Sequence, residues 1–418
     1  MDKKISNLFK GDKGIWMIFF FLCMISIVEV FSASSNLTYK SQNYISPILF
    51  HTIMIIFGAF MAIVTLNIPC KYFKLMTVPF LIISGFTLLW VFVGGQTING
   101  ANRVISIFGI TFQPSELAKG SVVLYTAQIL GATQGENGAD KKAFKWINIV
   151  LWPAVIAIGL ENLSTALLLL AVIIIMMWIG RVPYRQLGKL IGGLVAVAIF
   201  ALVMILAIGK NEPENKTLSK TDKLEKPQKE KTTLEKLLHR ADTWKGRIIK
   251  FTDHKDISPQ DYDLDKDAQV AHANIAIVSS NIIGKGPGNS EERDFLSQAF
   301  SDFIYAIIIE ETGIEGATVV CFLYIMLLFR TARIAARCKN NFPAFLAMGL
   351  SLLLVIQATF NMMVAVGWVP VTGQPLPLIS KGGTSTIINC VYMGVILSVS
   401  RWAKIKPEEK GKVEEKDA

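Results

Sequence analysis

Long apolar runs constrain the fold of this chain more than any other feature. The sequence has 418 residues, of which 52% are hydrophobic, and its apolar residues form runs of about 17 to 24 residues, the length that a helix needs to cross a bilayer. Short charged or Gly- and Pro-containing pieces separate the runs. The predicted fold class is an all-α polytopic membrane protein with ten transmembrane helices, at about 14–33, 46–68, 75–94, 114–132, 146–162, 164–180, 187–209, 303–329, 343–366 and 384–403.

The distribution of Lys and Arg predicts how the chain is oriented. Basic residues gather before the first run and in alternate loops thereafter, whereas the opposite short loops hold only Lys40, Arg103 and Lys381. Because cytoplasmic loops carry the excess of positive charge, we expect both termini in the cytoplasm and a long extracytoplasmic loop, 210–302, between the seventh and eighth helices. The net charge of +10 then reflects topology, and we expect no nucleic-acid partner.

The long loop divides into parts of different composition. Residues 210–232 are dense in Lys, Glu and Pro, so we expect a mobile linker that cannot bury enough apolar surface to fold. From about 233 to 251, apolar residues follow one helical stripe and basic residues such as Arg247 lie largely elsewhere, which predicts an amphipathic helix on the outer leaflet or packed on neighbouring spans. Residues 404–418 form a charged cytoplasmic tail, and the whole chain, 1–418, is expected to be one transmembrane domain.

The cysteines and histidines do not predict a disulfide framework or a metal site. All five Cys fall in the apolar runs or at their cytoplasmic ends, and the four His are scattered. Neither arrangement has the spacing typical of zinc ligands. We therefore expect no metal held by the protein.

Two charged residues lie inside the fourth run. Glu116 and Lys119 follow Pro114, a typical first residue of a helix, and positions three apart share a helix face. Ionisable groups in membrane spans usually face a bundle interior or a watery cavity, because exposure to lipid costs roughly 2.5 to 3.5 kcal/mol or more each. We expect the pair either to line a polar cavity that binds substrate or merely to fix helix packing.

Three further acids allow two interpretations each. Glu161, between the fifth and sixth runs, is expected at the outer surface, where it would cap the next helix together with Asn162 and Ser164. Glu310 and Glu311 lie two to three turns into the eighth run. They are expected to be either buried, hydrogen-bonded carboxylates or functional ones.

Many backbone breakers lie between the last two runs. The segment 367–385 contains three prolines and four glycines, and irregular backbone at membrane depth is tolerated only when it is buried in protein or lines a water-filled cavity. We favour a re-entrant loop that roofs a site, with a plain surface loop as the alternative. The residues that define this loop are Pro375, Pro377, Gly382 and Gly383.

A second glycine-rich turn, with Gly284, Gly286 and Gly288, precedes the eighth run. Asp302 follows it at the membrane boundary. A carboxylate there either acts on a substrate from the outer face or satisfies free backbone N–H groups as the N-cap of the next helix. The pattern alone favours neither role.

Four motifs together carry a family resemblance: NGANRVISIFGITFQPSELAK at 99–119, G-x-G-P-G-N-S at 284–290, SDFIYAIIIEETG at 301–313 and PVTGQPLPLISKGGTS at 370–385. In this order they resemble the shape, elongation, division and sporulation family, the FtsW and RodA group of bacterial cell-wall proteins. The resemblance covers nearly the whole chain, including the ten spans and the long loop. The last motif favours the division-type, FtsW-like members over the elongation-type, RodA-like members.

The resemblance implies an activity, a location and partners. Family members are glycosyltransferases of the bacterial cytoplasmic (inner) membrane that polymerise lipid II into glycan strands during cell division or elongation. They work with a class B penicillin-binding protein transpeptidase and other division proteins. Position by position, the family's essential outer-loop aspartate falls on Asp302, its basic residue before the fourth span on Arg103, and its intramembrane acid and base on Glu116 and Lys119.

The chain departs from the family's pattern at several of these places. The usual L-P-x-A-H-T-D-F is altered, with Ser297 in place of Pro and Phe300 in place of His. The glycine of the family's GEE is replaced by Ile309. The common S-Y-G-G reads Ser380, Lys381, Gly382 and Gly383, so that Lys381 adds an outer-face cation.

The implied reaction is attack of an acceptor sugar hydroxyl on the anomeric carbon of a donor sugar, with a lipid diphosphate leaving. It asks for a base near the hydroxyl and positive charge near the diphosphate, and Asp302 is assigned as the base. Whether a divalent cation accompanies the diphosphate is not decided by the sequence. The expected substrate-binding residues are Arg103 and Lys119, the latter oriented by Glu116, followed by Arg247, Lys381 and Ser380.

Two rival functions remain. A transporter that flips lipid II across the bilayer would explain the intramembrane pair of Glu116 and Lys119, but gives no reason for a motif-embedded acid on the outer side. A purely scaffolding member of the division machinery predicts that Asp302 variants stay functional in cells.

Overall fold

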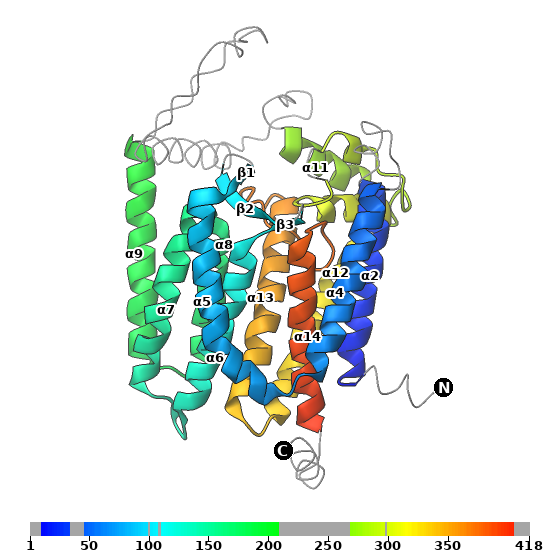
Figure 1. Ribbon diagram of the computed structural model, residues 1–418. Coiled ribbons are helices and arrows are strands. Elements are labelled where there is room, and N and C mark those ends of the chain that lie inside the picture. Colours follow the sequence, from blue (N-terminus) through cyan, green and yellow to red (C-terminus); the bar gives the residue numbers. More distant parts are fainter. Residues whose placement is uncertain are drawn as a thin grey trace, which may run out of the picture.

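The computed structural model describes residues 10–33, 46–98, 101–107, 110–208, 268–296 and 299–404. These residues form a bundle of long helices, with both chain ends at one end of the bundle and a cap of strands and short helices at the other (Figure 1). The linker 210–232, the amphipathic helix at 233–251 with Arg247, and the tail beyond 404 lie outside the described residues.

A helix occupies each predicted apolar run. The long helices are α2 (Lys13–Ala33), α4 (Ser46–Asn67), α5 (Cys70–Gly94), α6 (Pro114–Thr133), α7 (Lys141–Glu161), α8 (Leu163–Ile179), α9 (Tyr184–Ile208), α12 (Ile304–Arg337), α13 (Asn341–Ala365) and α14 (Thr384–Lys404). Within the described residues, seven helices are long and apolar enough to cross a membrane, and α8 is a shorter apolar helix. The polytopic helical class is confirmed, whereas the number of ten spans stays a prediction.

Several helices extend past the predicted limits. α5 begins at Cys70, α7 begins at Lys141, and α12 continues to Arg337. The added turns carry Lys or Arg, whose aliphatic stems can lie along apolar surface while the charged end reaches water. Hydropathy therefore marked the apolar part of each helix and missed its polar end.

Short strands lie between the helices. β1 (Gln96–Ile98), β2 (Ala101–Ile107) and β3 (Ile110–Phe112) form an antiparallel sheet between α5 and α6, with Ile105 opposite Phe112. A second pair, β4 (Gln134–Gly135) and β5 (Gly138–Ala139), closes the turn between α6 and α7. The sheet β1–β3 lies at the end of the bundle away from the chain termini (Figure 1).

The core forms around α13 and α14, the two most buried of the seven helices that are long and apolar enough to cross a membrane. α4 packs along α14, while α13 contacts α6, α8 and α12. Small residues permit the close approach of α4 and α14: a Cβ on Gly58 would meet Cys390 Sγ at 2.7 Å, and one on Gly394 would meet Ala62 O at 2.6 Å. Close contact through small residues is a common basis of helix packing in membranes.

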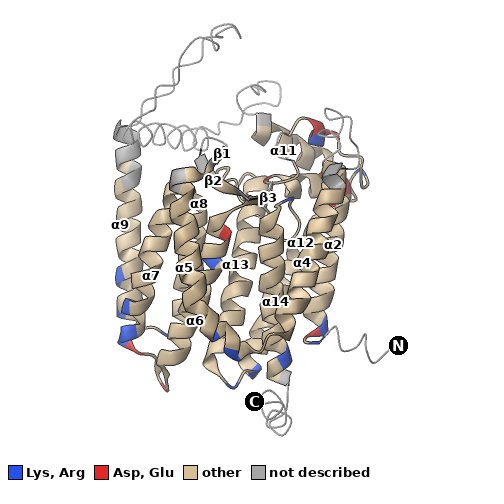
Figure 2. Ribbon diagram, in the orientation of Figure 1, with Lys and Arg blue, Asp and Glu red and all other residues tan. Residues whose placement is uncertain are grey.

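The charged side chains are distributed unevenly along the bundle. Lys and Arg gather at the end where the chain termini lie (Figure 2). The opposite end carries β1–β3, α11 (Ala268–Ser279) and η2 (Glu292–Asp294). Acidic and basic residues are sparse between the two ends, as expected where the surroundings are hydrocarbon.

Candidate functional site

A cavity of about 400 Å³ opens at the end of the bundle that carries β1–β3. It is built from α4, the β2–β3 region, the start of α8, the segment before α12 and the loop before α14. Its lining residues are Phe50, His51, Met54, Val104, Thr111, Gln113, Asn162, Phe300, Ser301, Asp302, Gly373, Pro375, Lys381, Gly382, Gly383 and Ser385.

Asp302 lines this cavity. The helix α12 begins at Ile304 with Phe303 in the cap position, so Asp302 precedes the N-cap position that we considered for it. Its side chain is half-buried, and the Ser301 hydroxyl donates a hydrogen bond to Asp302 Oδ1 at 3.0 Å. The carboxylate is therefore placed where it can meet a group inside the cavity.

Three successive backbone carbonyls fix the segment that carries Asp302. The carbonyl of residue 300 accepts from the Lys381 backbone N–H at 3.0 Å, and that of residue 301 accepts from the Ser380 hydroxyl at 2.6 Å. The carbonyl of Asp302 itself accepts from Asn361 Nδ2 at 2.8 Å. Since α13 and the loop before α14 supply all three donors, these elements determine the position of the acid.

Ser380 is buried beside the cavity and binds backbone groups on both sides of it. Its hydroxyl also accepts from the backbone N–H of Leu376 at 2.8 Å, the side chain is buried, and it is not among the cavity-lining residues. Ser380 thus connects the loop to the Asp302 segment. Its predicted contact with substrate stays untested.

The loop between α13 and α14 is packed inside the protein, as the re-entrant interpretation predicts. Leu376 and Ile379 are buried, Tyr324 donates its phenolic hydrogen to the Pro377 carbonyl, and Gln357 Nε2 donates to the Pro375 carbonyl at 3.1 Å. Gly383 has φ +54°, a left-handed conformation that glycine adopts readily. The loop therefore forms a fixed wall of the cavity.

Lys381 is the predicted cation that lines the cavity. Its ammonium lies 5.2 Å from the centre of the Phe300 ring, a distance at which the ring attracts a cation. Burial lowers the pKa of Lys381 from its ordinary value, because a desolvated ammonium is less stable. Lys381 and Asp302 bring a basic and an acidic side chain, an amine and a carboxylate, to the same cavity.

Glu116 and Lys119 form the predicted ion pair. Lys119 Nζ donates to Glu116 Oε1 at 2.8 Å and to Gln357 Oε1 at 2.7 Å, and both charged side chains are buried. Neither residue lines the cavity. Because Gln357 also holds Pro375, the pair is joined to the cavity wall through one intermediate side chain.

Glu310 and Glu311 hold the glycine-rich turn. Glu310 accepts from Lys285 Nζ at 2.8 Å, the Glu291 backbone N–H at 3.1 Å and the Ser290 hydroxyl. The Glu310 hydrogen bond raises the pKa of Lys285. Glu310 is thus a buried, hydrogen-bonded carboxylate.

Glu311 holds the turn from its other side. It accepts from the Gly288 backbone N–H at 2.9 Å and from the Ser32 hydroxyl. A Cβ on Gly284, whose φ is +81°, would meet the Glu311 carbonyl oxygen at 2.4 Å. The turn therefore needs glycine where it crosses α12. Gly286 and Gly288 also have positive φ.

Glu161 is not at the surface as we predicted. It is the last residue of α7 and is 5% exposed. The cap of α8 comes from Asn162, whose Oδ1 accepts from the backbone N–H of Ser164 at 3.0 Å. An amide at this position accepts these bonds without adding a charge, which explains why the neighbouring acid is not needed as the cap.

The other two predicted cations lie outside what the structure describes. The backbone of Arg103 belongs to β2, whose Val104 lines the cavity, but the Arg103 side chain is not among the described atoms. Arg247 falls in the undescribed part of the long loop. Their predicted contacts with substrate stay predictions.

Sequence reasoning missed several polar residues around the cavity. His51 lines the cavity, while Gln357 and Asn361 hold its walls from α13. His51 lies in the second apolar run, Gln357 and Asn361 lie in the ninth, and none of them belongs to a motif. A polar residue inside a predicted span was the available signal, because such residues usually face the bundle interior.

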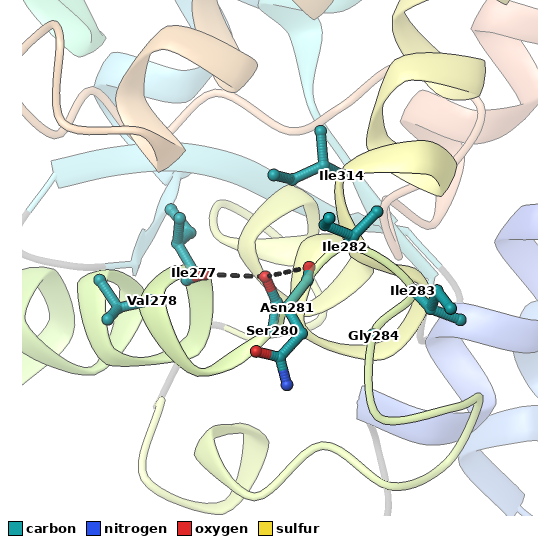
Figure 3. A pocket seen from close by; sticks show the side chains of 8 residues that line it. All are labelled: Ile277, Val278, Ser280, Asn281, Ile282, Ile283, Gly284 and Ile314. Carbon is teal, nitrogen blue, oxygen red and sulfur yellow. Dashed lines mark hydrogen bonds between the residues drawn. The ribbon is translucent and has the colours of Figure 1, made fainter.

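A second cavity, of about 600 Å³, lies beside the turn after α11. Ile277, Val278, Ile282, Ile283 and Ile314 contribute apolar walls, and the Ser280 hydroxyl donates to the carbonyl of residue 277 at 2.8 Å (Figure 3). None of the residues that line it is ionisable. Acid–base chemistry therefore has no group there, in contrast to the cavity at Asp302.

The described residues contain no group of three or more His, Cys, Asp or Glu side chains placed to hold a metal ion.

The fold and the cavity define a multi-pass α-helical membrane protein with an ionisable site near one end of its bundle. A family profile described as "Cell cycle protein" matches residues 13–405. The chain belongs to this FtsW/RodA/SpoVE family.

Relatives and solved structures cover almost the whole chain. A probable peptidoglycan glycosyltransferase FtsW of Geobacter sp. (strain M18) is 28% identical over 93% of this chain and 96% of its own length. The protein of the same name from Enterococcus hirae is 26% identical over 94% of each chain.

Two solved structures have the same fold. One belongs to work described as "Structural coordination of polymerization and crosslinking by a peptidoglycan synthase complex", with a TM-score of 0.67, 21% identity, and 95% of this chain and 99% of that chain covered. The rod shape determining protein RodA of Thermus thermophilus has a TM-score of 0.63 and 20% identity, with 96% of this chain and 100% of that chain covered.

Proposed function

We propose that this protein is a peptidoglycan glycosyltransferase that polymerises lipid II into glycan strands, with Asp302 as the general base. The observation that carries the proposal is the presence of Asp302 and Lys381 in one cavity. The names of the relatives from Geobacter sp. and Enterococcus hirae support the reaction class.

In the proposed reaction, the acceptor hydroxyl attacks the anomeric carbon of the donor sugar. Its proton passes to the Asp302 carboxylate, a carbon–oxygen bond forms, and the bond to the lipid diphosphate breaks with its electron pair on the departing phosphate oxygen. Lys381 offsets the negative charge that develops on the diphosphate. Arg103 remains a second candidate for this task, since β2 borders the cavity.

The proposed orientation follows the distribution of charge. Lys and Arg gather at the end of the bundle where the termini lie (Figure 2), which supports a cytoplasmic location for that end. The cavity at Asp302 then opens on the extracytoplasmic side of the bacterial cytoplasmic membrane. On the extracytoplasmic side we place the linker 210–232 and the amphipathic helix 233–251. On the cytoplasmic side we place the charged tail 404–418.

The proposed partner is a class B penicillin-binding protein transpeptidase, together with other division proteins. The likeness to a chain of a peptidoglycan synthase complex supports a partner that crosslinks what this chain polymerises. The names of the relatives favour the division-type role over the elongation-type role. Depletion in cells tests that choice, because filaments indicate a block in septation and round cells a block in elongation.

Purified protein with its partner, given lipid II, tests the proposed reaction. We expect Asp302→Asn to abolish glycan polymer, because the amide cannot accept the proton. Asp294→Asn is the matched control, since Asp294 is a half-exposed acid outside the cavity lining, and it should polymerise at the wild-type rate. Polymer from Asp302→Asn at that rate would exclude Asp302 as the base.

A flippase remains the rival function, and vesicles with lipid II on one face distinguish the two. Polymer made from lipid II on the outer face supports the enzyme, whereas translocation without polymer supports the transporter. The location of the cavity at one end of the bundle, apart from the buried pair of Glu116 and Lys119, favours the enzyme.

A further inference from the structure

His51 lies in the same cavity as Asp302 and Lys381, although it belongs to a different part of the chain. These three are the only residues with an ionisable side chain in the described lining. His51 is almost fully buried, at 2% exposure. Its side chain is therefore enclosed by protein on the sides that do not border the cavity. A polar ring buried in a membrane span usually faces a polar site in the bundle interior.

The hydrogen bonds of His51 determine which of its nitrogens carries the proton. Nε2 lies 2.9 Å from Ser26 Oγ on α2. The Ser26 hydroxyl donates its only hydrogen to the Ile379 carbonyl at 2.7 Å, so Ser26 Oγ can only accept from the ring. Nε2 therefore carries a hydrogen, and in the neutral ring Nδ1 is left with the lone pair.

The remaining nitrogen is available to a ligand. No hydrogen bond to His51 Nδ1 is found among the described residues. A neutral imidazole nitrogen with a lone pair accepts a hydrogen bond from a hydroxyl or an amide. The proposed substrate carries many sugar hydroxyls, and the cavity lining offers Asp302 as its other ionisable acceptor.

We propose that His51 is a substrate-binding residue whose Nδ1 accepts a hydrogen bond from a sugar hydroxyl of the substrate, with Ser26 as the positioning residue that fixes its tautomer. The proposal rests on the proposed function for the nature of the substrate. The hydrogen bonds from His51 to Ser26 and from Ser26 to the Ile379 carbonyl also connect α4 and α2 to the loop that carries Lys381. They hold His51 and Lys381 in a fixed position relative to each other.

Two amide substitutions at His51 separate substrate binding from a purely structural role. The side-chain oxygen of Asn can take the place of Nδ1, whereas the amide nitrogen of Gln can take the place of Nε2. His51→Gln thus keeps the donor to Ser26 and loses the acceptor. His51→Asn keeps the acceptor and loses the bond to Ser26.

The measurements are the rate of glycan formation from lipid II by the purified protein with its partner, and binding of lipid II to the protein in nanodiscs. We expect His51→Gln to raise KM and weaken binding about fivefold to tenfold, as the loss of one hydrogen bond predicts. His51→Asn should retain most of the affinity. Ser26→Ala should fall between them, because the ring can then adopt either tautomer.

The reverse order would overturn the proposal. If His51→Gln binds and reacts like the wild type while His51→Asn fails, His51 serves only to connect α2, α4 and the loop. Wild-type affinity in both variants would also exclude it. The proposed function fails by a separate result, namely wild-type protein that binds lipid II and makes no polymer, and the binding measurement still tests His51 in that case.

Discussion

Removal of the charge of Lys119 should destabilise the protein strongly. Lys119 Nζ is fully buried and donates to Glu116 and Gln357. Glu116 Oε2 already has no hydrogen-bond partner among the described residues, so in Lys119→Met the carboxylate stays buried without its countercharge. Loss of one partner of a buried ion pair costs about 3 to 5 kcal/mol, and we expect a loss of that size in the free energy of unfolding.

Replacement of both partners should behave differently. A buried ion pair exchanged for apolar side chains of similar volume is often neutral or stabilising. The double variant Glu116→Met with Lys119→Met should therefore recover most of the stability, which gives a large coupling energy in a double-mutant cycle. Reversible unfolding in detergent gives the free energy of unfolding of the wild type, the two single variants and the double variant. Lys339→Met, at an exposed position, is the control, and its free energy of unfolding should stay within about 0.5 kcal/mol of the wild type.

Two results would refute this reasoning. Lys119→Met within about 1 kcal/mol of the wild type would mean that the carboxylate is not left uncompensated, and losses that simply add in the double variant would mean that the two charges do not interact. The activity of the double variant decides between the alternatives raised by the sequence. A stable, active double variant assigns the pair to helix packing, whereas a stable, inactive one assigns Lys119 or Glu116 to the substrate.

Three further outcomes can be checked on the same purified protein. Gly313→Ala should cost about 1 to 3 kcal/mol from backbone strain alone, because Gly313 has φ +69°, whereas Gly192→Ala, with open space around it, should be neutral or stabilising in thermal unfolding. Asn361→Leu should lower kcat with little change in KM, because it frees the carbonyl of the proposed base, and an unchanged kcat would contradict a positioning role. The pKa of Lys285 is raised above its ordinary value of 10.5 by its bond to Glu310, so its stabilisation is present below that pH and is lost as the pH rises through the raised value. Lys285→Met should remove this alkaline part of the unfolding profile.

Local patterns predicted the parts of the site that lie close together in sequence. Glu116 and Lys119 are three residues apart on one helix, and helical geometry alone is enough to bring them together. The density of glycine and proline before α14 predicted buried irregular backbone, since a membrane leaves few other places for it. The first feature depends only on the spacing of residues along one helix, and the second depends only on the surrounding lipid. Both can therefore be predicted from the sequence without knowledge of the tertiary packing.

The contacts that build the cavity could not be predicted in this way. His51 and Asp302 are far apart in the chain and come together only through the packing of α4 beside the loop before α14. The sequence also did not separate capping from a cavity position for Asp302, because both place an acid just before a helix. For Glu161 the sequence prediction was wrong. An acid between two spans predicted an exposed side chain at the outer surface, whereas tertiary packing buries it.

The break at Gly313 divides the 34-residue helix α12 into two parts with different tasks. At 1.5 Å per residue, the apolar turns from Ile314 to Phe329 are about 24 Å long, which is shorter than a hydrocarbon core of about 30 Å. The buried turns between Asp302 and Gly313 therefore complete the apolar length of α12, and they fix the position of Asp302 relative to the break. Exchanges at the exposed apolar residues Phe322 and Ile325 should consequently be tolerated much better than exchanges at the buried residues from Ile304 to Ile309, which hold Asp302 in place.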